Sequence, residues 1–198
     1  MQSQAAHQAA RQTADHAARG GVDVCIRGSG AVGASLALAL GRQGLRVALI
    51  GADATAAARG APDLRAYALN AGSVALLRAL KVWDALPADA ATAVYDMRID
   101  GDAGGSALRF SAWQQRVAEL AWIVDAAALD GALAAALRFA PHVEWLPATA
   151  AEPPAPLRVL AEGKASAERA RLGVSFDLRP YGQRRVAARL VADRPHGG

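Results

Sequence analysis

Apolar and polar positions between residues 22 and 53 follow the order strand, glycine turn, helix, strand. Asp23 to Arg27 carries the apolar run Val-Cys-Ile, which has the length of a strand. Ala31 to Leu40 is apolar on almost every side and rich in helix formers, so a buried helix is expected there. Gly44 suits the position just past the end of that helix. Leu45 to Ile50 supplies the second strand, and the intervening helix predicts parallel pairing through a right-handed crossover.

The glycines between the first strand and the helix have the spacing G-x-G-x-x-G. Gly28 permits a tight turn, Gly30 lets the backbone approach a pyrophosphate, and Gly33 lets the helix pack closely on the strand. The helix N-terminus offers unpaired N–H groups to the phosphates. Because strand, helix and second strand all surround the motif, the sequence predicts a dinucleotide-binding turn. Its predicted cofactor-binding residues also include the three that lie between the glycines, Ser29, Ala31 and Val32.

One part of the dinucleotide fingerprint is missing. An acidic residue that binds the ribose hydroxyls is expected at the end of the second strand, about 20 residues after the turn. Gly51 occupies that place, and the nearest acid is Asp53. Two interpretations stay open: Asp53 binds the ribose from the loop, or backbone groups and water do so.

The pattern changes after residue 62. A helical face is expected over Ala71 to Leu80, followed by a short turn at Val82 and Trp83. Alternating residues from Thr92 to Asp100 predict one strand, with Ala107 to Phe110 as its hairpin partner. The remaining elements are a strand over Leu120 to Val124, a helix over Ala126 to Phe139 capped by Asp125, strands over Val143 to Leu146 and Leu157 to Leu160, a helix over Ser166 to Leu172, and a long strand over Tyr181 to Ala192.

Composition limits the class of protein. The chain has 198 residues, a net charge of +4 and 53% hydrophobic residues, which suffices for a core. Its arginines are scattered among acids, so a nucleic-acid partner is not expected. Cys25 is the only cysteine, which excludes an intrachain disulfide and favours a cytoplasmic location. No apolar run approaches the roughly 20 residues of a membrane span, although peripheral membrane contact stays open. Residues 1–21 are polar and predict a mobile leader outside the fold.

Four segments, in order, resemble the para-hydroxybenzoate-hydroxylase-like flavoprotein monooxygenases, and within them the ubiquinone-biosynthesis hydroxylase branch. They are GSGAVGASLALALGRQGLRVAL; DLRAYALNAGSVALLRALKVWDAL; the pair YDMRIDGDAGG and LAWIVDAAALDGAL; and EGKASAER with YGQRRVAARLVADRPHGG. The resemblance implies an α/β fold: a Rossmann-like FAD-binding domain with a parallel sheet and helices, plus part of an antiparallel substrate-domain sheet. It assigns residues 22–198 to this domain, with an incomplete substrate-domain insertion at about 92–125 and 179–198.

The resemblance also assigns roles to residues of this chain. It implies that Arg65 faces FAD, where a guanidinium suits a phosphate. Glu162 and Gly163, with Ser166 and Arg169, match a motif associated with FAD and the pyridine nucleotide. Glu162 stands where relatives have Asp, and Ala126 stands where they often have a polar residue near the flavin. No catalytic residue and no metal ligand is assigned.

The activity that the resemblance implies is hydroxylation of an aromatic ring with FAD, NAD(P)H and oxygen, the cofactor supplying the chemistry. The substrate is expected to be a small aromatic molecule, which could carry a prenyl group. Relatives are about twice as long, so we expect the chain to be truncated and to turn over no NAD(P)H by itself. Two alternatives stay open: an NAD(P)-dependent dehydrogenase, which would place more parallel strands after Ile50, and an inactive remnant or interaction module.

Overall fold

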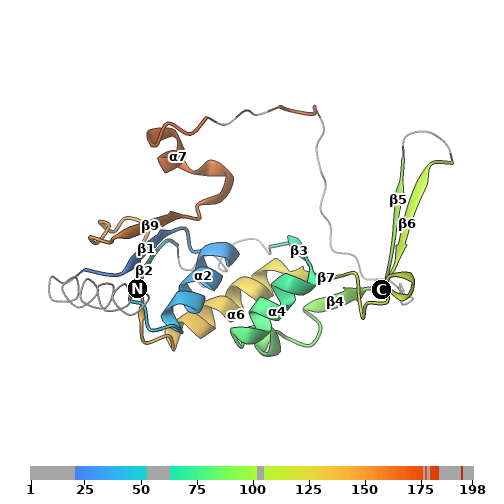
Figure 1. Cartoon of the computed structure of the whole chain (residues 1–198), viewed down its shortest axis with the longest axis horizontal. Coiled ribbons are helices and arrows are strands. Elements are labelled where there is room, and N and C mark those ends of the chain that lie inside the picture. The colour runs from blue at the N-terminus through green and yellow to red at the C-terminus, as the bar shows by residue number, and fades with distance from the viewer. Residues whose placement is uncertain are drawn as a thin grey trace, which may run out of the picture. The chain divides into compact units, whose positions relative to one another are not determined.

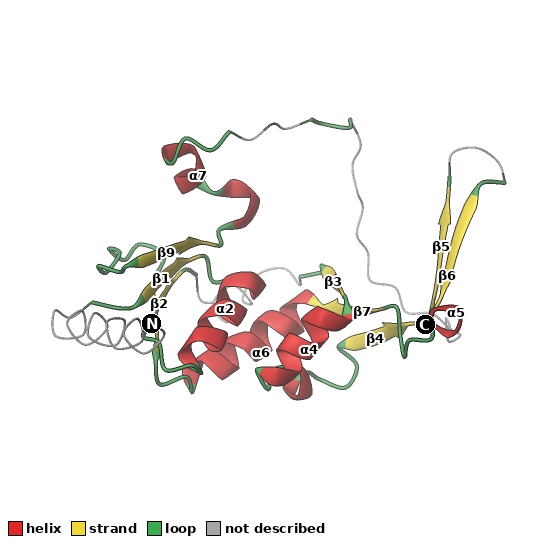
Figure 2. Ribbon diagram, in the orientation of Figure 1, coloured by secondary structure: helices red, strands yellow, loops and turns green. Residues whose placement is uncertain are grey.

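The structure is a computed structural model that describes residues 21–52, 63–101, 105–175, 177, 179–182 and 193. The described residues divide into two compact units, the first with residues 21–52 and 133–179 and the second with residues 63–132 and 180–182. Figures 1 and 2 show their helices and strands. Residues 1–20 of the predicted leader and nearly all of the strand predicted over Tyr181 to Ala192 lie outside the described residues. The predicted division into an FAD-binding domain and an insertion stays a prediction.

The first unit is built on a parallel four-stranded sheet. Its strands are β1 (Val24–Arg27), β2 (Val47–Ile50), β8 (Val143–Leu146) and β9 (Leu157–Leu160), in the order β8-β2-β1-β9. Helix α2 (Ala31–Gly41) connects β1 to β2, which pair in parallel as predicted (Figure 1). In the two central strands, Ile26 and Leu49 are fully buried. Strands that are buried on both faces need continuous apolar runs, which explains the composition of β1 and β2.

The second unit contains an antiparallel sheet of order β3-β7-β4, formed by β3 (Ala66–Leu69), β4 (Ala91–Val94) and β7 (Ala121–Asp125). Helix α4 (Ala71–Ala79) follows β3 and begins at Asn70, whose side chain accepts a hydrogen bond from Ser73 N at 2.8 Å. A 3-10 turn, η1 (Trp83–Ala85), comes next. Trp83 packs edge-to-face on Trp122 of β7, with ring centroids 5.2 Å apart.

A two-stranded hairpin forms a separate sheet in the second unit. Strands β5 (Asp96–Asp100) and β6 (Ala107–Ser111) pair antiparallel, and the short helix α5 (Ala112–Gln115) follows (Figure 2). The hairpin was predicted, but the expectation of one strand from Thr92 to Asp100 was wrong. The predicted strand is interrupted at Tyr95 and forms two separate strands, because β4 pairs with β7 whereas β5 pairs with β6.

Helix α6 (Ala126–Arg138) contributes residues to both units and buries Leu129, Leu133 and Leu137. Its predicted cap is confirmed, because Asp125 Oδ1 accepts a hydrogen bond from Ala128 N at 3.0 Å. The elements after β9 are η2 (Gly163–Ala165) and α7 (Ala167–Arg171), which Ser166 caps by accepting from Arg169 N. None of the described helices is long and apolar enough to cross a membrane.

The sequence reading missed β3. Its four residues, Ala-Tyr-Ala-Leu, contain no β-branched side chain and precede a helix directly. The strand exists because it pairs with β7, more than 50 positions later in the chain, where Ala66 lies opposite Asp125. Such long-range pairing overrides local propensity.

Truncating the centre of the parallel sheet should lower stability strongly. Leu49→Ala removes a fully buried side chain from β2, and we expect it to reduce the free energy of unfolding by about 2–5 kcal/mol. The matched control is Leu157→Ala in β9, whose side chain is 52% exposed and whose loss should cost roughly 1 kcal/mol or less. Chemical denaturation followed by circular dichroism measures both values. Equal losses for the two variants would contradict the assigned core.

Candidate nucleotide-binding site

The predicted glycine turn lies at the carboxyl end of β1, between the ends of β2 and β9. Gly28 has φ of +105°, a left-handed conformation that favours glycine, and its N–H donates to Ile50 O at 2.8 Å. A Cβ on Gly28 would collide with the backbone carbonyl of Ala161 and lie 2.8 Å from Glu162 N. The turn and the segment after β9 therefore touch backbone to backbone, which only glycine permits at this position.

The other two glycines play different parts. A Cβ on Gly33 would overlap the carbonyl oxygen of Gly28, so this glycine lets α2 pack against the turn, as predicted. Gly30 has open space around it, with no neighbouring atom within 4 Å of where its Cβ would be. Its backbone is extended, with φ of −67° and ψ of 179°. The position nearest the expected pyrophosphate is therefore unobstructed.

Helix α2 begins directly at this open position. Gly30 is its N-cap and supplies no side-chain hydrogen bond, and no acidic residue lies in the first turn. The first N–H that bonds within the helix is that of Ala34, which donates to Gly30 O at 2.9 Å. The N–H groups of Ala31, Val32 and Gly33 precede it and suit an anion, because the helix dipole places partial positive charge at this end.

The end of β2 lies beside the turn. Ser29 Oγ donates to Ala52 O at 2.6 Å, which ties the turn to the residue after Gly51. Trp145 of β8 donates through Nε1 to Gly51 O at 3.3 Å. The place of the expected ribose acid is thus packed with neutral groups. Asp53, predicted as a substitute, lies outside the described residues.

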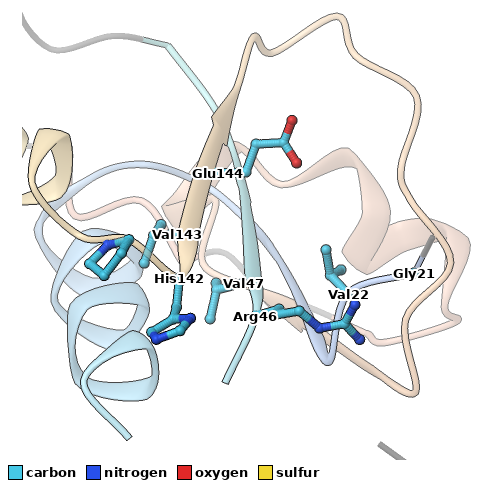
Figure 3. A pocket seen from close by; sticks show the side chains of 8 residues that line it. Gly21, Val22, Arg46, Val47, His142, Val143 and Glu144 are labelled. Atoms are coloured by element: carbon cyan, nitrogen blue, oxygen red, sulfur yellow. The ribbon is translucent and has the colours of Figure 1, made fainter. Parts of the chain in front are cut away.

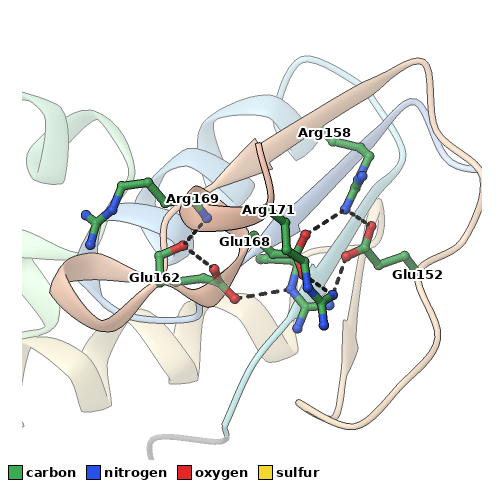
Figure 4. A network of polar contacts seen from close by, with 8 residues as sticks. Glu152, Arg158, Glu162, Glu168, Arg169 and Arg171 are labelled. Atoms are coloured by element: carbon green, nitrogen blue, oxygen red, sulfur yellow. Dashed lines mark hydrogen bonds and ion pairs between the residues drawn. The ribbon is translucent and has the colours of Figure 1, made fainter. Parts of the chain in front are cut away.

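Glu162 belongs to a chain of ion pairs that runs along the edge of the parallel sheet (Figure 4). Arg27, at the end of β1, donates through Nε to Glu162 at 3.2 Å and through Nη1 to Glu152 at 2.8 Å. Arg158 of β9 pairs with Glu152 at 2.5 Å and with Glu168 at 4.0 Å, and Arg171 pairs with Glu168 at 2.7 Å. This network joins β1, β9, α7 and the loop before β9.

The carboxylate of Glu162 also accepts a hydrogen bond from Ser166 Oγ at 2.6 Å. The Ser166 hydroxyl, followed by the Arg27 guanidinium, holds the pKa of Glu162 below its usual range. Glu162 therefore has two defined hydrogen-bond partners, Arg27 and Ser166, although the resemblance leads us to expect an aspartate at this position. The structure brings Glu162 and Gly163 to the glycine turn, because Ala161 N donates to Arg27 O at 2.7 Å.

Two further motif residues lie beside this segment. Ser166 caps α7, and Arg169 Nη2 donates to Lys164 O at 2.8 Å. A pocket of about 160 Å³ is lined by Glu162, Gly163, Ser166 and Arg169, among others. This volume is below the roughly 300–1,000 Å³ of small-molecule sites. The motif residues therefore support the turn without enclosing a ligand of their own.

Arg65 lies in the second unit, just before β3. Its guanidinium donates to both oxygens of Asp63 through Nε, at 2.9 and 3.1 Å, and through Nη2 at 2.6 Å. These bonds lower the pKa of Asp63 to about 2. Asp130 Oδ2 of α6 lies 3.9 Å from Nη2, and burial raises the pKa of Asp130. The side chain of Arg65 is 64% exposed, and Nη1 makes no hydrogen bond to any described residue, so one edge can receive a phosphate.

A larger pocket of about 390 Å³ lies at the opposite end of the parallel sheet (Figure 3). Val22, Arg46 and His142 line it, and they precede or begin strands β1, β2 and β8. Arg46 is held by Asp23, to which it donates through its backbone N at 2.8 Å and through Nη2 at 3.2 Å. Ligands of open parallel sheets bind at the carboxyl ends of the strands. The pocket is therefore separate from the nucleotide site.

Sequence reasoning missed Arg27, Glu152 and Asp130. Arg27 was read only as the last residue of a strand, although a charge directly before a glycine turn was a visible signal. Glu152 lies in a proline-rich loop, and Asp130 lies on a helix, so neither carried a local pattern. Among the described residues, no group of three or more His, Cys, Asp and Glu side chains could hold a metal ion.

Comparisons with known proteins agree with this geometry. Residues 21–111 match the model of an FAD binding domain. A 68-residue stretch is 43% identical to 3-demethoxyubiquinol 3-hydroxylase of Escherichia coli K12, over 33% of this chain and 17% of that protein. Thus the match spans only a small part of the relative's length.

Two solved structures share the fold. PqsL of Pseudomonas aeruginosa, described as a probable FAD-dependent monooxygenase, aligns with a TM-score of 0.61 and 23% identity, over 81% of this chain and 48% of that one. The p-nitrophenol 4-monooxygenase PnpA of Pseudomonas putida DLL-E4 aligns with a TM-score of 0.60 and 20% identity, over 79% and 44%. The chain spans about half the length of these proteins. Residues 21–111 are therefore similar to the FAD binding domain family, and the fold of the chain resembles that of these two solved monooxygenases.

Proposed function

We propose that the chain provides the FAD-binding part of a flavoprotein monooxygenase that hydroxylates a small aromatic ring with NAD(P)H and oxygen. One observation carries the proposal: the glycine turn is open at Gly30, directly before the first N–H groups of α2, which receive no side-chain cap from Gly30. The match to the FAD binding domain model and the similarity to a ubiquinol hydroxylase support it. We extend the proposal to a ubiquinone-precursor-like substrate, with or without a prenyl chain, and to a cytoplasmic location.

The residues present fit the pyrophosphate of FAD. The N–H groups of Ala31 to Gly33 and the helix dipole of α2 stabilise two negative phosphates, and Gly30 leaves the space they need. The role of Arg65 in binding a phosphate of FAD stays a proposal that rests on the family resemblance, because Arg65 lies in the second unit. When bound, the flavin supplies the redox and oxygen chemistry. The role of this chain is to bind and orient its nucleotide half.

The dehydrogenase alternative is less consistent with the fold. It requires further parallel strands directly after β2, but the next five strands along the chain, β3 to β7, all pair antiparallel. Of the later strands that the structure describes, only β8 and β9 return to the parallel sheet. This arrangement favours an FAD-binding domain with a second, antiparallel sheet.

Filling the space at Gly30 should block FAD without unfolding the chain. Gly30→Val places a side chain where no atom lies within 4 Å, on an extended backbone that valine tolerates. We expect the dissociation constant for FAD to rise about tenfold, which corresponds to a loss of about 1.4 kcal/mol in binding free energy. Quenching of flavin fluorescence measures this constant. The matched control, Gly131→Val on α6, also enters open space and should leave FAD binding unchanged. Unaltered FAD binding by a folded Gly30→Val would contradict the proposed site.

The lowered pKa of Glu162 predicts a pH-dependent stability. A carboxylate whose pKa is depressed in the folded state stabilises the protein above its unfolded pKa, near 4.5, and loses this effect as pH falls through the folded value. Glu162→Gln should therefore reduce the free energy of unfolding at pH 7 by about 1 kcal/mol, and the difference from wild type should shrink below pH 4.5. Denaturant titrations at several pH values measure it.

Glu144→Gln is the control for this experiment. Glu144 lies exposed in β8 and forms no ion pair with any residue that the structure describes. Its substitution should change stability little and equally at all pH values. If the loss of stability in Glu162→Gln were the same at all pH values, the charge of the carboxylate would not be what stabilises the segment after β9.

A further inference from the structure

The end of β2 holds no acidic ribose ligand because its place is already filled. A Cβ on Gly51 would collide with Ser29 Oγ, lie 2.6 Å from Ser29 Cβ and lie 2.7 Å from Ser29 N. Real Cβ atoms essentially never approach other atoms within 3.0 Å. Any side chain at position 51, acidic or not, is therefore incompatible with the turn in this conformation. The absence of an acid at position 51 and the presence of Ser29 in the turn therefore depend on each other.

The hydroxyl of Ser29 has a fixed orientation. Its proton is donated to Ala52 O at 2.6 Å, which leaves the lone pairs of Oγ as acceptors. The neighbouring carbonyl of Gly51 already accepts from Trp145 Nε1 at 3.3 Å. Ser29 is only partly buried, and its hydrogen bond to Ala52 O lies at an exposed position. An oriented hydroxyl thus offers a neutral acceptor beside the residue at which the fingerprint expects an acid.

We propose that Ser29 Oγ accepts a hydrogen bond from a ribose hydroxyl of the adenosine half of the bound dinucleotide, in place of the acidic ligand. This inference rests on the proposed function, because it requires the phosphates to lie on the turn at Gly30. It makes Ser29 a specificity-determining residue for the sugar. It also makes this part of the site uncharged.

ADP is a suitable probe, because it carries the two phosphates and the ribose without the flavin. The experiment compares ADP with 2′,3′-dideoxy-ADP, which lacks both ribose hydroxyls, on wild type and on Ser29→Ala in the full chain by isothermal titration calorimetry. We expect Ser29→Ala to weaken the binding of ADP about fivefold, because one neutral hydrogen bond is lost. Binding of 2′,3′-dideoxy-ADP should stay within about twofold.

This comparison separates ribose recognition from a structural role of Ser29. If the serine only ties the turn to Ala52, both nucleotides lose affinity equally, and the proposal is overturned. An unchanged affinity for ADP also overturns it. Ser106→Ala, an exposed serine before β6, is the matched control and should change neither constant.

Two further outcomes discriminate the remaining explanations. Asp53→Asn should leave the affinity for ADP unchanged. If this variant instead lost affinity for ADP but not for 2′,3′-dideoxy-ADP, Asp53 would be the residue that binds the ribose, and the proposal for Ser29 would be overturned. If wild type binds ADP but Ser29→Ala shows no selective loss, only the ribose proposal fails. If wild type binds neither ADP nor FAD, the proposed function itself fails.

Discussion

The close approach of two backbone segments at Gly28 is the constraint on which the rest of the site depends. The turn after β1 and the segment after β9 touch so closely that no Cβ fits between them. Because β1 pairs with both β2 and β9, this contact brings three strand ends together. Helix α2 then starts beside that junction, and the N–H groups of Ala31 to Gly33 receive no side-chain cap from Gly30. The proposed binding surface for phosphates therefore consists of backbone groups.

Polar side chains stabilise this junction from its outer edge. Arg27 bridges Glu152 and Glu162, and Ser166 adds a hydrogen bond to Glu162. Because these groups are only partly exposed, with Arg27 and both glutamates at 21–25%, their ion pairs are screened less than surface pairs. The longer Glu162 side chain departs from the aspartate that the resemblance leads us to expect, and it binds the arginine before the turn. The glycine at position 51 is a second departure from the dinucleotide fingerprint, and it too has a structural partner, because Ser29 packs against it.

The parallel sheet and its turn could be predicted from sequence because their signals are local. The buried strands β1 and β2 are short apolar runs, and the glycine spacing fixes the turn. The strand β3 and the break at Tyr95 could not be predicted, since both depend on which distant strand each segment pairs with. The predicted site residues Gly28 to Gly33, Glu162 and Gly163 lie in one region of the first unit. Arg27 and Glu152 were missed because they pair with each other across 125 positions of the chain.

The central claim is that a nucleotide's phosphates bind the backbone N–H groups at the start of α2. The most direct measurement is a titration of the isotope-labelled chain with ADP, followed by backbone amide resonances in NMR. We expect the largest shifts at Gly30 to Gly33, because these amides would donate to the phosphates. Shifts confined to Arg46, Val47 and His142 at the opposite end of the sheet, or no shifts at Gly30 to Gly33 under saturating ADP, would contradict the account.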